Sequence, residues 1–489
     1  MSTPSIKPRP ALVAAILILI TLAVGAVAIT TQSFWMDEGN AIIKAVASSV
    51  PGMWKSSTYY GGSEIQMPLF MLSLWGWEKI AGDSEYALRA LNLPFLVIMV
   101  LALRRFRFWP VVCLMSPFVL YYVGELRPYM LQMAGAALGF SALSRILQQD
   151  SAGDSGGEDL GGLHALLFAG LFLAATSLTA VLGSAGLFLG LLIARPCWLQ
   201  RKRFWLIVAG WTPLALLVLG YYGYTLMAGY RGTMDRGGGL LSMGFGCYEM
   251  MGLVGLGPRR EDLRGANLLG LFRAYPWLPL AALVIFTAWC AGLKRFVAAY
   301  SLRARIALAC SVMFPLMFFV GVSVVANFSV LGRHLSPLIP VLLLPLACAC
   351  ESAVTRPRLR PVAVGAVICA CVSSAMVRFS DRHARDDYRG ATRLVLEALR
   401  KGRSVLWQAD MNTPRFYAFR EGGMPLVYYI QRLEPDEPID PGSADMIFIN
   451  RPNLRYPKGD HRLILSKEGF ELGATLIGFE IWERRRAGH

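Results

Sequence analysis

The sequence predicts an α-helical polytopic membrane domain, residues 1–378, followed by a small α/β domain, residues 379–489. The chain is 55% hydrophobic and only 16% charged, which is too apolar for an ordinary soluble protein of 489 residues. Several of its apolar runs are long enough to cross a bilayer. Short basic clusters separate these runs, whereas the last part of the chain mixes acidic and basic residues.

The first predicted span covers residues 11–30. Its core contains no charged residue, and Lys7 and Arg9 precede it. Such a beginning is also typical of a signal peptide, but the run is long and lacks a small-x-small cleavage site. We therefore expect a retained helix.

The net charge of +16 resides mostly in the membrane domain, in short clusters between apolar runs. This is the positive-inside pattern, which orients helices and meets anionic headgroups. The distribution argues against nucleic-acid binding. The clusters are Arg104-Arg105-Phe106-Arg107, Arg201-Lys202-Arg203, Lys294-Arg295 with Arg303 and Arg305, and Arg356, Arg358 and Arg360.

With these clusters as cytoplasmic markers, we expect about eleven spans, the N-terminus inside and the C-terminus outside. Residues 161–194 are too long for one span and are divided near Ser177. Residues 148–162, rich in Gly, Ser and Asp, are expected to form a flexible cytoplasmic loop. The predicted spans are residues 11–30, 85–103, 108–123, 128–147, 162–178, 180–194, 204–225, 275–293, 306–326, 334–350 and 361–378.

The first outer loop, residues 31–84, contains two apolar segments that are too short and interrupted to span, residues 38–49 and 68–80. Trp75 and Trp77 lie near the polar end of the second segment, and aromatic residues favour the membrane interface. A span at residues 68–80 would also place the cluster Arg104–Arg107 outside, against the positive-inside pattern. We therefore expect interfacial juxtamembrane helices.

Two further stretches are expected outside. Residues 226–272 carry Arg236-Gly237-Gly238-Gly239 and Arg259-Arg260-Glu261-Asp262, which fit a solvated loop, a misplaced span or a loop over an anionic ligand. In the C-terminal domain we expect a helix at residues 387–401 and strands at 404–408, 446–450 and 475–482. His383, beside several aspartates, is expected in a solvated junction rather than a metal site.

Nine cysteines provide neither a disulfide framework nor a CxxC metal site. Seven of them lie in apolar runs, Cys197 lies in a predicted cytoplasmic loop, and Cys247 alone is expected outside. The motifs require neither a metal nor a cofactor, so we expect none to be needed, and a divalent ion bound by carboxylates is left open.

Polar residues at the outer ends of spans are the candidate site, because polar groups at membrane depth are expensive. A shared cavity at that face would hold acids to activate a hydroxyl and arginines to bind a phosphate through their planar fork. Simpler interpretations are acids that flank a span, a Glu125–Arg127 pair, and headgroup contacts at Arg333 and His334. The candidates are Asp37, Glu38, Tyr59, Tyr60, Glu64, Gln66, Glu125, Arg127, Tyr129, Arg333 and His334.

The order of several short motifs resembles the polyprenyl-phosphate-dependent GT-C glycosyltransferases, in particular bacterial relatives of protein O-mannosyltransferases and of the lipid A aminoarabinose transferase. The resemblance extends over nearly the whole chain. The motifs are Asp37-Glu38 after the first span, Gln66-Met67-Pro68-Leu69-Phe70, Gly82-Asp83-Ser84-Glu85-Tyr86-Ala87-Leu88-Arg89, Glu125-Leu126-Arg127-Pro128-Tyr129, Gly332-Arg333-His334-Leu335-Ser336-Pro337 and Asp387-Tyr388-Arg389-Gly390-Ala391.

This resemblance implies an inverting transfer of a sugar from a lipid-phosphate donor at the outer face of a bacterial inner membrane. It implies that Asp37 is catalytic with Glu38 in support, that Glu64 lines the pocket, and that Arg127 and Arg333 grip the donor phosphate. The family's usual Pro-Pro is Met67-Pro68 here. The extra domains of eukaryotic protein mannosyltransferases are absent, so the acceptor is left open among glycolipid, polysaccharide and protein.

Two rival functions come from other classes. A lipid-linked saccharide flippase or other transporter would line a passage with these charges, but transporters tend to have repeated halves and polar residues near mid-membrane. We find no internal repeat, and the charges gather at one face. A membrane scaffold with an exported binding domain leaves the acidic pair unexplained.

Overall fold

The computed structural model describes residues 10–151, 159–229, 240–258, 268–421, 430–432, 441–442, 444–452, 456 and 460–485. The chain forms two compact units. We call the first the membrane unit; it comprises residues up to Ile29, Gly61–Ser73 and Arg89–Ser380. The C-terminal unit comprises Thr30–Tyr60, Leu74–Leu88 and the residues from Asp381 onward. The predicted first outer loop is therefore divided between the two units.

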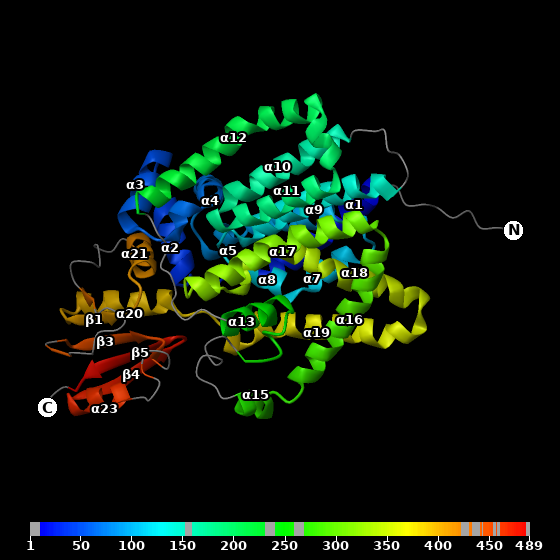
Figure 1. Ribbon diagram of the computed structural model, residues 1–489. Helices are drawn as coiled ribbons and strands as arrows, with labels where there is room; N and C mark the ends of the chain where they lie inside the picture. Colours follow the sequence, from blue (N-terminus) through cyan, green and yellow to red (C-terminus); the bar gives the residue numbers. More distant parts are fainter. Residues whose placement is uncertain are drawn as a thin grey trace. The chain divides into compact units, whose positions relative to one another are not determined.

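Long α-helices build the membrane unit (Figure 1). In the described part of the chain, eight segments are long and apolar enough to cross a bilayer, and two shorter apolar segments accompany them. The helices are α1 (Pro10–Ala28), α6 (Asn92–Ala102), α7 (Trp109–Met115), α8 (Pro117–Val123), α9 (Tyr129–Ser151), α10 (Leu160–Thr176), α11 (Val181–Ala194), α12 (Lys202–Met227), α13 (Leu240–Met250), α15 (Leu268–Ala274), α16 (Leu278–Ala298), α17 (Leu302–Val325), α18 (Ile339–Thr355) and α19 (Arg360–Phe379).

The predicted spans coincide with helical segments, which confirms the fold class of a polytopic helical membrane protein. The spans predicted at residues 85–103 and 108–123 differ, because each consists of two short helices. The first comprises α5 (Glu85–Arg89) and α6, and the second comprises α7 and α8, which have seven residues each. Ser116 separates them with extended backbone, and its hydroxyl accepts a hydrogen bond from the Val119 N–H at 3.4 Å. Pro117 suits the first turn of α8, where a missing N–H costs nothing.

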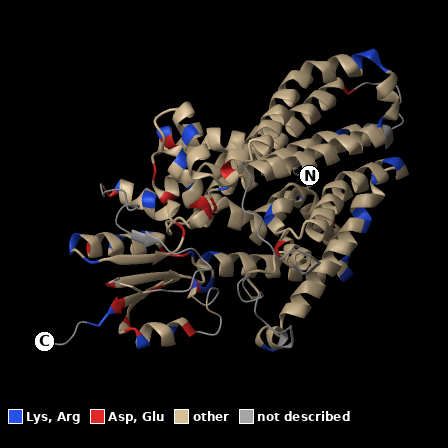
Figure 2. Cartoon of the chain, turned by 60° about the vertical axis from the view of Figure 1, so that its left-hand side comes forward, with Lys and Arg blue, Asp and Glu red and all other residues tan. Residues whose placement is uncertain are grey.

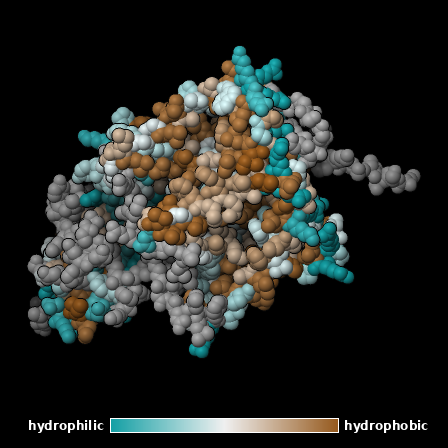
Figure 3. Space-filling view, viewed as in Figure 1, coloured by the Kyte–Doolittle hydropathy of each residue, from teal (hydrophilic) through white to brown (hydrophobic). Residues whose placement is uncertain are grey.

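Apolar side chains cover the outer sides of these helices. Leu216 and Leu217 on α12 are 64% and 69% exposed, which would be costly in water but suits contact with lipid. Figure 3 shows a broad apolar surface over the long helices. Figure 2 shows Lys and Arg gathered at helix ends, as expected when the middle of each helix lies in hydrocarbon.

Small residues allow close helix packing in the membrane unit. Gly186 and Gly190, four residues apart on α11, face α17. A Cβ on Gly190 would lie 3.0 Å from the Ala307 carbonyl oxygen and 3.1 Å from the Ser311 Cβ. Helices in lipid associate through such close van der Waals contact, because apolar burial gives them little driving force. A glycine pair at this spacing therefore fixes the approach of α11 to α17.

The C-terminal unit contains short helices and a five-stranded sheet in the order β2-β1-β3-β5-β4. The strands β1, β2 and β3 are parallel, whereas β5 is antiparallel to both β3 and β4. Figure 1 shows α20 and α23 on opposite faces of this sheet, which explains why β1 and β3 are buried along their whole length. The elements are α2 (Met36–Ala45), α3 (Val50–Tyr60), α20 (Tyr388–Arg400), β1 (Val405–Gln408), α21 (Asn412–Arg420), β2 (Ile430–Arg432), β3 (Met446–Asn450), α23 (Asp460–Lys467), β4 (Phe470–Leu476) and β5 (Phe479–Arg484).

Two short helices join the units in sequence: α4 (Pro68–Ala81) and α5 (Glu85–Arg89). The helices predicted at residues 38–49 and 68–80 correspond to α2 and α4, whereas α3 was not predicted from the sequence. The prediction of one strand at residues 475–482 is wrong. The chain turns at Gly478, whose φ is +79°, so these residues form the end of β4 and the beginning of the antiparallel β5. Glycine tolerates this conformation because it has no Cβ.

Candidate active site

A buried ion pair joins two of the candidate residues in the membrane unit. The Arg127 guanidinium donates to the Glu64 carboxylate at 2.5 Å and to the Ser63 hydroxyl at 3.2 Å. The side chains of Arg127 and Glu64 are only 4% and 2% exposed. Glu64 lies in the 3-10 helix η1 (Ser63–Gln66), and Gln66 at its end is half-buried. The pairing brings together residues from the first outer loop and from the loop that precedes α9.

Asn92 supports the turn that carries Arg127. Its buried side-chain amide donates to the carbonyl oxygens of Tyr122, Val123 and Glu125, at 3.3, 3.0 and 2.7 Å. These carbonyls lie at the C-terminal end of α8, where the last carbonyls have no partner within the helix. We did not single out Asn92 from the sequence. The available signal was a polar residue inside a long apolar run, where such residues are expensive.

Arg333 and His334 lie in the 3-10 helix η4 (Gly332–Leu338), directly before α18. The Leu331 N–H donates to His334 Nδ1 at 3.1 Å, and the imidazole lies near Phe328, with ring centroids 5.2 Å apart. Glu249 on α13 accepts a hydrogen bond from the Gly332 N–H at 2.8 Å. The sequence reasoning missed Glu249, whose only signal was that it is the one charged residue in the otherwise apolar run of residues 240–258.

A chain of hydrogen bonds connects η4 with α9, whose first residue is Tyr129. The Ser336 hydroxyl donates to the Gln132 side-chain oxygen at 2.5 Å, and the Gln132 amide donates to the Ser177 hydroxyl at 2.7 Å. All three side chains are buried. Because Ser336 follows Arg333 by one helical turn, these bonds place the Arg333 segment beside the helix that follows Arg127. The buried Tyr129 ring packs edge-on against Tyr122, with centroids 4.7 Å apart.

Asp37 and Glu38 lie in the first turn of α2, in the C-terminal unit. Acidic residues are favourable there because the helix dipole is positive at that end. Glu38 is buried, forms an ion pair with Arg385, and accepts a hydrogen bond from the Trp35 N–H at 3.3 Å. Asp37 is half-buried. The two acids therefore differ: Glu38 is part of the packing, and Asp37 is the more accessible carboxylate.

Tyr59 and Tyr60 end α3 in the same unit. Their rings are edge-on, with centroids 5.0 Å apart, and the Arg415 guanidinium lies 5.6 Å from the centre of the Tyr60 ring. Tyr59 is largely exposed. Aromatic faces and a guanidinium at this spacing form a cation–π contact. They also present the kind of surface on which a sugar ring could pack.

The candidate residues therefore fall into two groups. The structure brings Glu64 and Arg127 together, and it places the segments of Gln66, Tyr129, Arg333 and His334 in the same unit. Asp37, Glu38, Tyr59 and Tyr60 belong to the C-terminal unit. The proximity of Asp37 to the two arginines stays a prediction.

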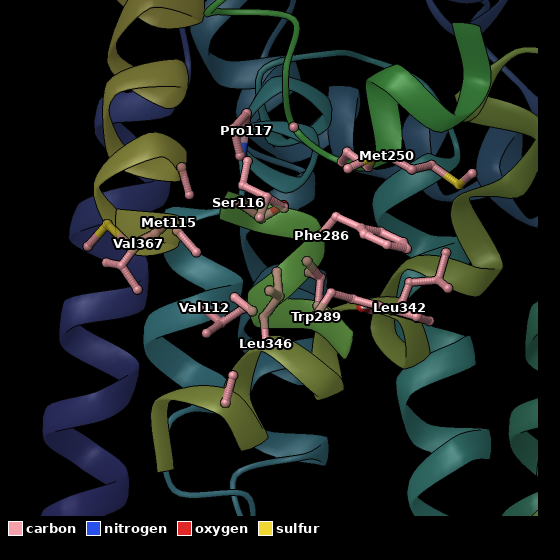
Figure 4. A pocket seen from close by; sticks show the side chains of 18 of the residues that line it. Val112, Met115, Ser116, Pro117, Met250, Phe286, Trp289, Leu342, Leu346 and Val367 are labelled. Atoms are coloured by element: carbon pink, nitrogen blue, oxygen red, sulfur yellow. Dashed lines mark hydrogen bonds between the residues drawn. The ribbon is translucent and has the colours of Figure 1, made fainter. Parts of the chain in front are cut away.

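A separate apolar cavity of about 250 Å³ lies among α7, α13, α16, α18 and α19 (Figure 4). Phe286, Trp289, Leu342, Leu346 and Met250 point into it, and it contains none of the candidate polar residues. An apolar cavity does not hold water well. It suits hydrocarbon rather than a phosphate or a sugar.

Within the described residues, no group of three His, Cys, Asp or Glu side chains is placed to hold a metal ion. The His383 ring nitrogen Nε2 lies 3.2 Å from the Arg382 guanidinium. The glycine- and arginine-rich motifs of residues 236–239 and 259–262 lie outside the described residues. The expectations of no metal and no cofactor stay predictions.

The fold is similar to that of ArnT from Cupriavidus metallidurans, a lipid A aminoarabinose transferase with the GT-C fold. The crystal structure of ArnT in the apo state matches with a TM-score of 0.51 and 14% identity, covering 96% of this chain and 98% of ArnT. ArnT bound to undecaprenyl phosphate matches with a TM-score of 0.50 and 13% identity, covering 98% and 99%. No family model and no curated protein sequence matches the chain. The predicted GT-C fold is thus confirmed.

Proposed function

We propose that this GT-C-fold membrane protein is an inverting glycosyltransferase. It transfers a sugar from a polyprenyl-phosphate donor to an envelope acceptor at the outer face of a bacterial inner membrane. The observation that carries the proposal is the match over nearly the whole chain to a structure of ArnT bound to undecaprenyl phosphate. The acceptor class is a glycolipid, a polysaccharide or a protein.

In the proposed reaction, the Asp37 carboxylate removes the proton from an acceptor hydroxyl. The hydroxyl oxygen attacks the anomeric carbon from the face opposite the phosphate, so a new C–O bond forms with inversion. The bond between the anomeric carbon and the phosphate oxygen breaks, and its electron pair leaves with the polyprenyl phosphate. We assign Tyr59 and Tyr60 to binding of the sugar. Gln66, Tyr129 and His334 are assigned to the wall of the substrate pocket.

The leaving phosphate needs charge stabilisation more than a protonating acid, since a lipid phosphate is already a good leaving group. Arg127 and Arg333 are assigned to it, because a guanidinium binds phosphate oxygens in a bidentate manner and stays charged when poorly hydrated. Arg127 is paired with Glu64 in the structure. A phosphate must therefore compete with the Glu64 carboxylate for this guanidinium.

The test uses purified full-length protein in detergent, lipid extract from the producing cells as the donor source, and envelope extract as the acceptor source. Mass spectrometry is expected to detect a sugar-sized mass gain on an acceptor with the wild-type protein and none with Asp37→Asn. The variant should still bind undecaprenyl phosphate. Full transfer by Asp37→Asn would remove this residue from the reaction.

The same assay separates transfer from transport. A flippase moves its cargo between leaflets and forms no covalent product, so it would give no mass gain in detergent, where leaflets do not exist. Addition of EDTA tests the expected independence from metal, and we expect transfer to continue at an unchanged rate. A complete loss that Mg²⁺ or Mn²⁺ restores would assign a metal to the reaction.

A further inference from the structure

Residues far along the chain hold the segment that leads into Asp37. The Phe34 N–H donates to the Tyr417 hydroxyl at 2.8 Å, and the Arg389 N–H donates to the Ser33 hydroxyl at 3.0 Å. The Phe34 ring packs against those of Phe416 and Tyr417, with centroids 5.6 and 6.1 Å apart. Both Ser33 and Phe34 are buried. The backbone before Asp37 is thus fixed from the start of α20 and from α21.

The segment after Asp37 is held from the same direction. Glu38 pairs with Arg385, and the Asn412 amide donates to the Asn40 side-chain oxygen at 2.5 Å. Between them, Gly39 packs directly on α21: a Cβ on Gly39 would lie 2.7 Å from the Thr413 Cα. No side chain fits at that distance from a backbone atom. Asp37 is therefore bracketed on both sides by contacts to residues 385–417.

A polar network anchors these contacts within the C-terminal unit. The Tyr417 hydroxyl donates to the Glu85 carboxylate at 3.0 Å, and the Arg389 guanidinium donates to the same carboxylate at 2.9 Å. Burial, followed by the negative Glu85, raises the pKa of Tyr417 above its ordinary value. Tyr417 therefore stays a neutral phenol that donates to Glu85 and accepts from Phe34.

We infer that Arg385, Thr413 and Tyr417 are positioning residues for the Asp37 carboxylate. This inference rests on the proposed role of Asp37. Arg385 neutralises Glu38, so that the second acid of the pair stays buried in the packing of α2. The close contact of Thr413 with Gly39 and the hydrogen bond from the Phe34 N–H to Tyr417 then fix the start of α2. The start of α2 in turn sets the direction of the Asp37 side chain. The C-terminal residues thus assist the reaction by orienting its base rather than by touching the substrate.

The experiment compares Arg385→Gln, Arg385→Lys and Gly39→Ala with the wild type in the transfer assay. A misplacement of about 1 Å can cost about a hundredfold in rate, so we expect kcat to fall about a hundredfold in Arg385→Gln and Gly39→Ala. The KM for the donor lipid should stay within about threefold, because donor binding is assigned to other residues. Arg385→Lys keeps the charge and should recover part of kcat.

Arg393→Gln is the matched control. Arg393 lies on α20 and forms an exposed ion pair with Glu421 at 2.8 Å, so its loss should leave kcat unchanged. Hydrogen exchange of the peptide covering residues 33–40 provides a readout that does not need activity. Exchange there should be faster in Arg385→Gln and Gly39→Ala, while the strands β1 and β3 keep their protection.

Unchanged exchange at residues 33–40 together with unchanged kcat would overturn the inference. A rise in KM with kcat preserved would also overturn it, because it would place these residues in binding. The two proposals fail differently. If Asp37→Asn keeps full activity, the role of Asp37 is wrong, whereas the exchange measurement still decides whether Arg385 orders the segment.

Discussion

Arg127 and Glu64 form a buried ion pair, with 2.5 Å between guanidinium nitrogen and carboxylate oxygen, although 62 residues separate them in the chain. Removal of one partner leaves an uncompensated charge in a poorly hydrated place. We expect Arg127→Met or Glu64→Leu to lower the free energy of unfolding by about 3–5 kcal/mol.

Thermal unfolding in detergent measures this effect, and the double variant Glu64→Leu with Arg127→Met should recover part of the loss. Arg295→Met provides the control, since Arg295 and Glu351 form a partly exposed pair at 3.6 Å. The free energy of unfolding of Arg295→Met should fall by less than about 1 kcal/mol. Equal changes at both pairs would contradict the burial argument.

The same pair makes a prediction about donor binding. If Arg127 binds the lipid phosphate, Glu64 competes for it, so Glu64→Gln should tighten the binding of undecaprenyl phosphate. Arg127→Ala should weaken it, by about 1.5–3 kcal/mol for a lost charged hydrogen bond. Native mass spectrometry with a titration of the lipid measures both affinities. Equal affinity in all three proteins would remove the phosphate role of Arg127.

Asn92 offers a prediction about the support of this site. Asn92→Leu removes the donor for three buried carbonyls at the end of α8. An unsatisfied buried polar group costs about 1–3 kcal/mol, so we expect a lower unfolding temperature and weaker donor binding. Thr21→Val is the control, because the Thr21 hydroxyl bonds only to the Leu17 carbonyl of its own helix in the described contacts. A similar loss in both variants would contradict a specific role for Asn92.

The spans, their basic ends and the candidate segments could be predicted from the sequence, because run length and charge are local properties. The partner of Arg127 could not be predicted from the sequence. Glu125 lies two residues away and was the obvious partner, whereas the observed partner, Glu64, is distant in the chain. Asn92 was hidden within an apolar run, and the contacts of Tyr417 and Arg385 join residues more than 340 positions apart. The turn at Gly478 was missed because Leu476 and Ile477 continue the apolar pattern into β5.

Glu480 makes the C-terminal unit sensitive to acid. Burial opposes its charge, but hydrogen bonds from His461, Arg462 and Trp482 outweigh this and hold the pKa of Glu480 below its ordinary value. The resulting stability is present above the ordinary pKa of about 4.5 and is lost as pH falls through the lower folded value. Glu480→Gln should flatten the fall in unfolding temperature between about pH 5 and pH 3.

Thermal unfolding at a series of pH values tests this prediction. Glu471→Gln serves as its control, because Glu471 on the neighbouring strand is exposed and lies 3.9 Å from Arg485. A Glu471→Gln curve that flattens as much as the Glu480→Gln curve would assign the acid sensitivity to general charge instead.

The orientation of the chain can be tested by cysteine labelling. A variant that keeps only Cys197, an exposed residue of the predicted cytoplasmic side, should react with a membrane-impermeant maleimide only after permeabilisation. A cysteine-free variant with Arg400→Cys, on an exposed position of α20, should react in intact spheroplasts. Mass-tag gel shifts measure both reactions. Reversed labelling would place the C-terminal unit in the cytoplasm.

The grouping of Thr30–Tyr60 with the residues after Asp381 has a consequence for biosynthesis. The ribosome releases the segment around Asp37 early, but its packing partners emerge only after more than three hundred further residues, and closing so long a loop is slow. Until then the segment around Asp37 lacks these packing partners. A chain that ends before residue 381 would therefore contain the helices of the membrane unit but none of the residues that pack against the segment around Asp37.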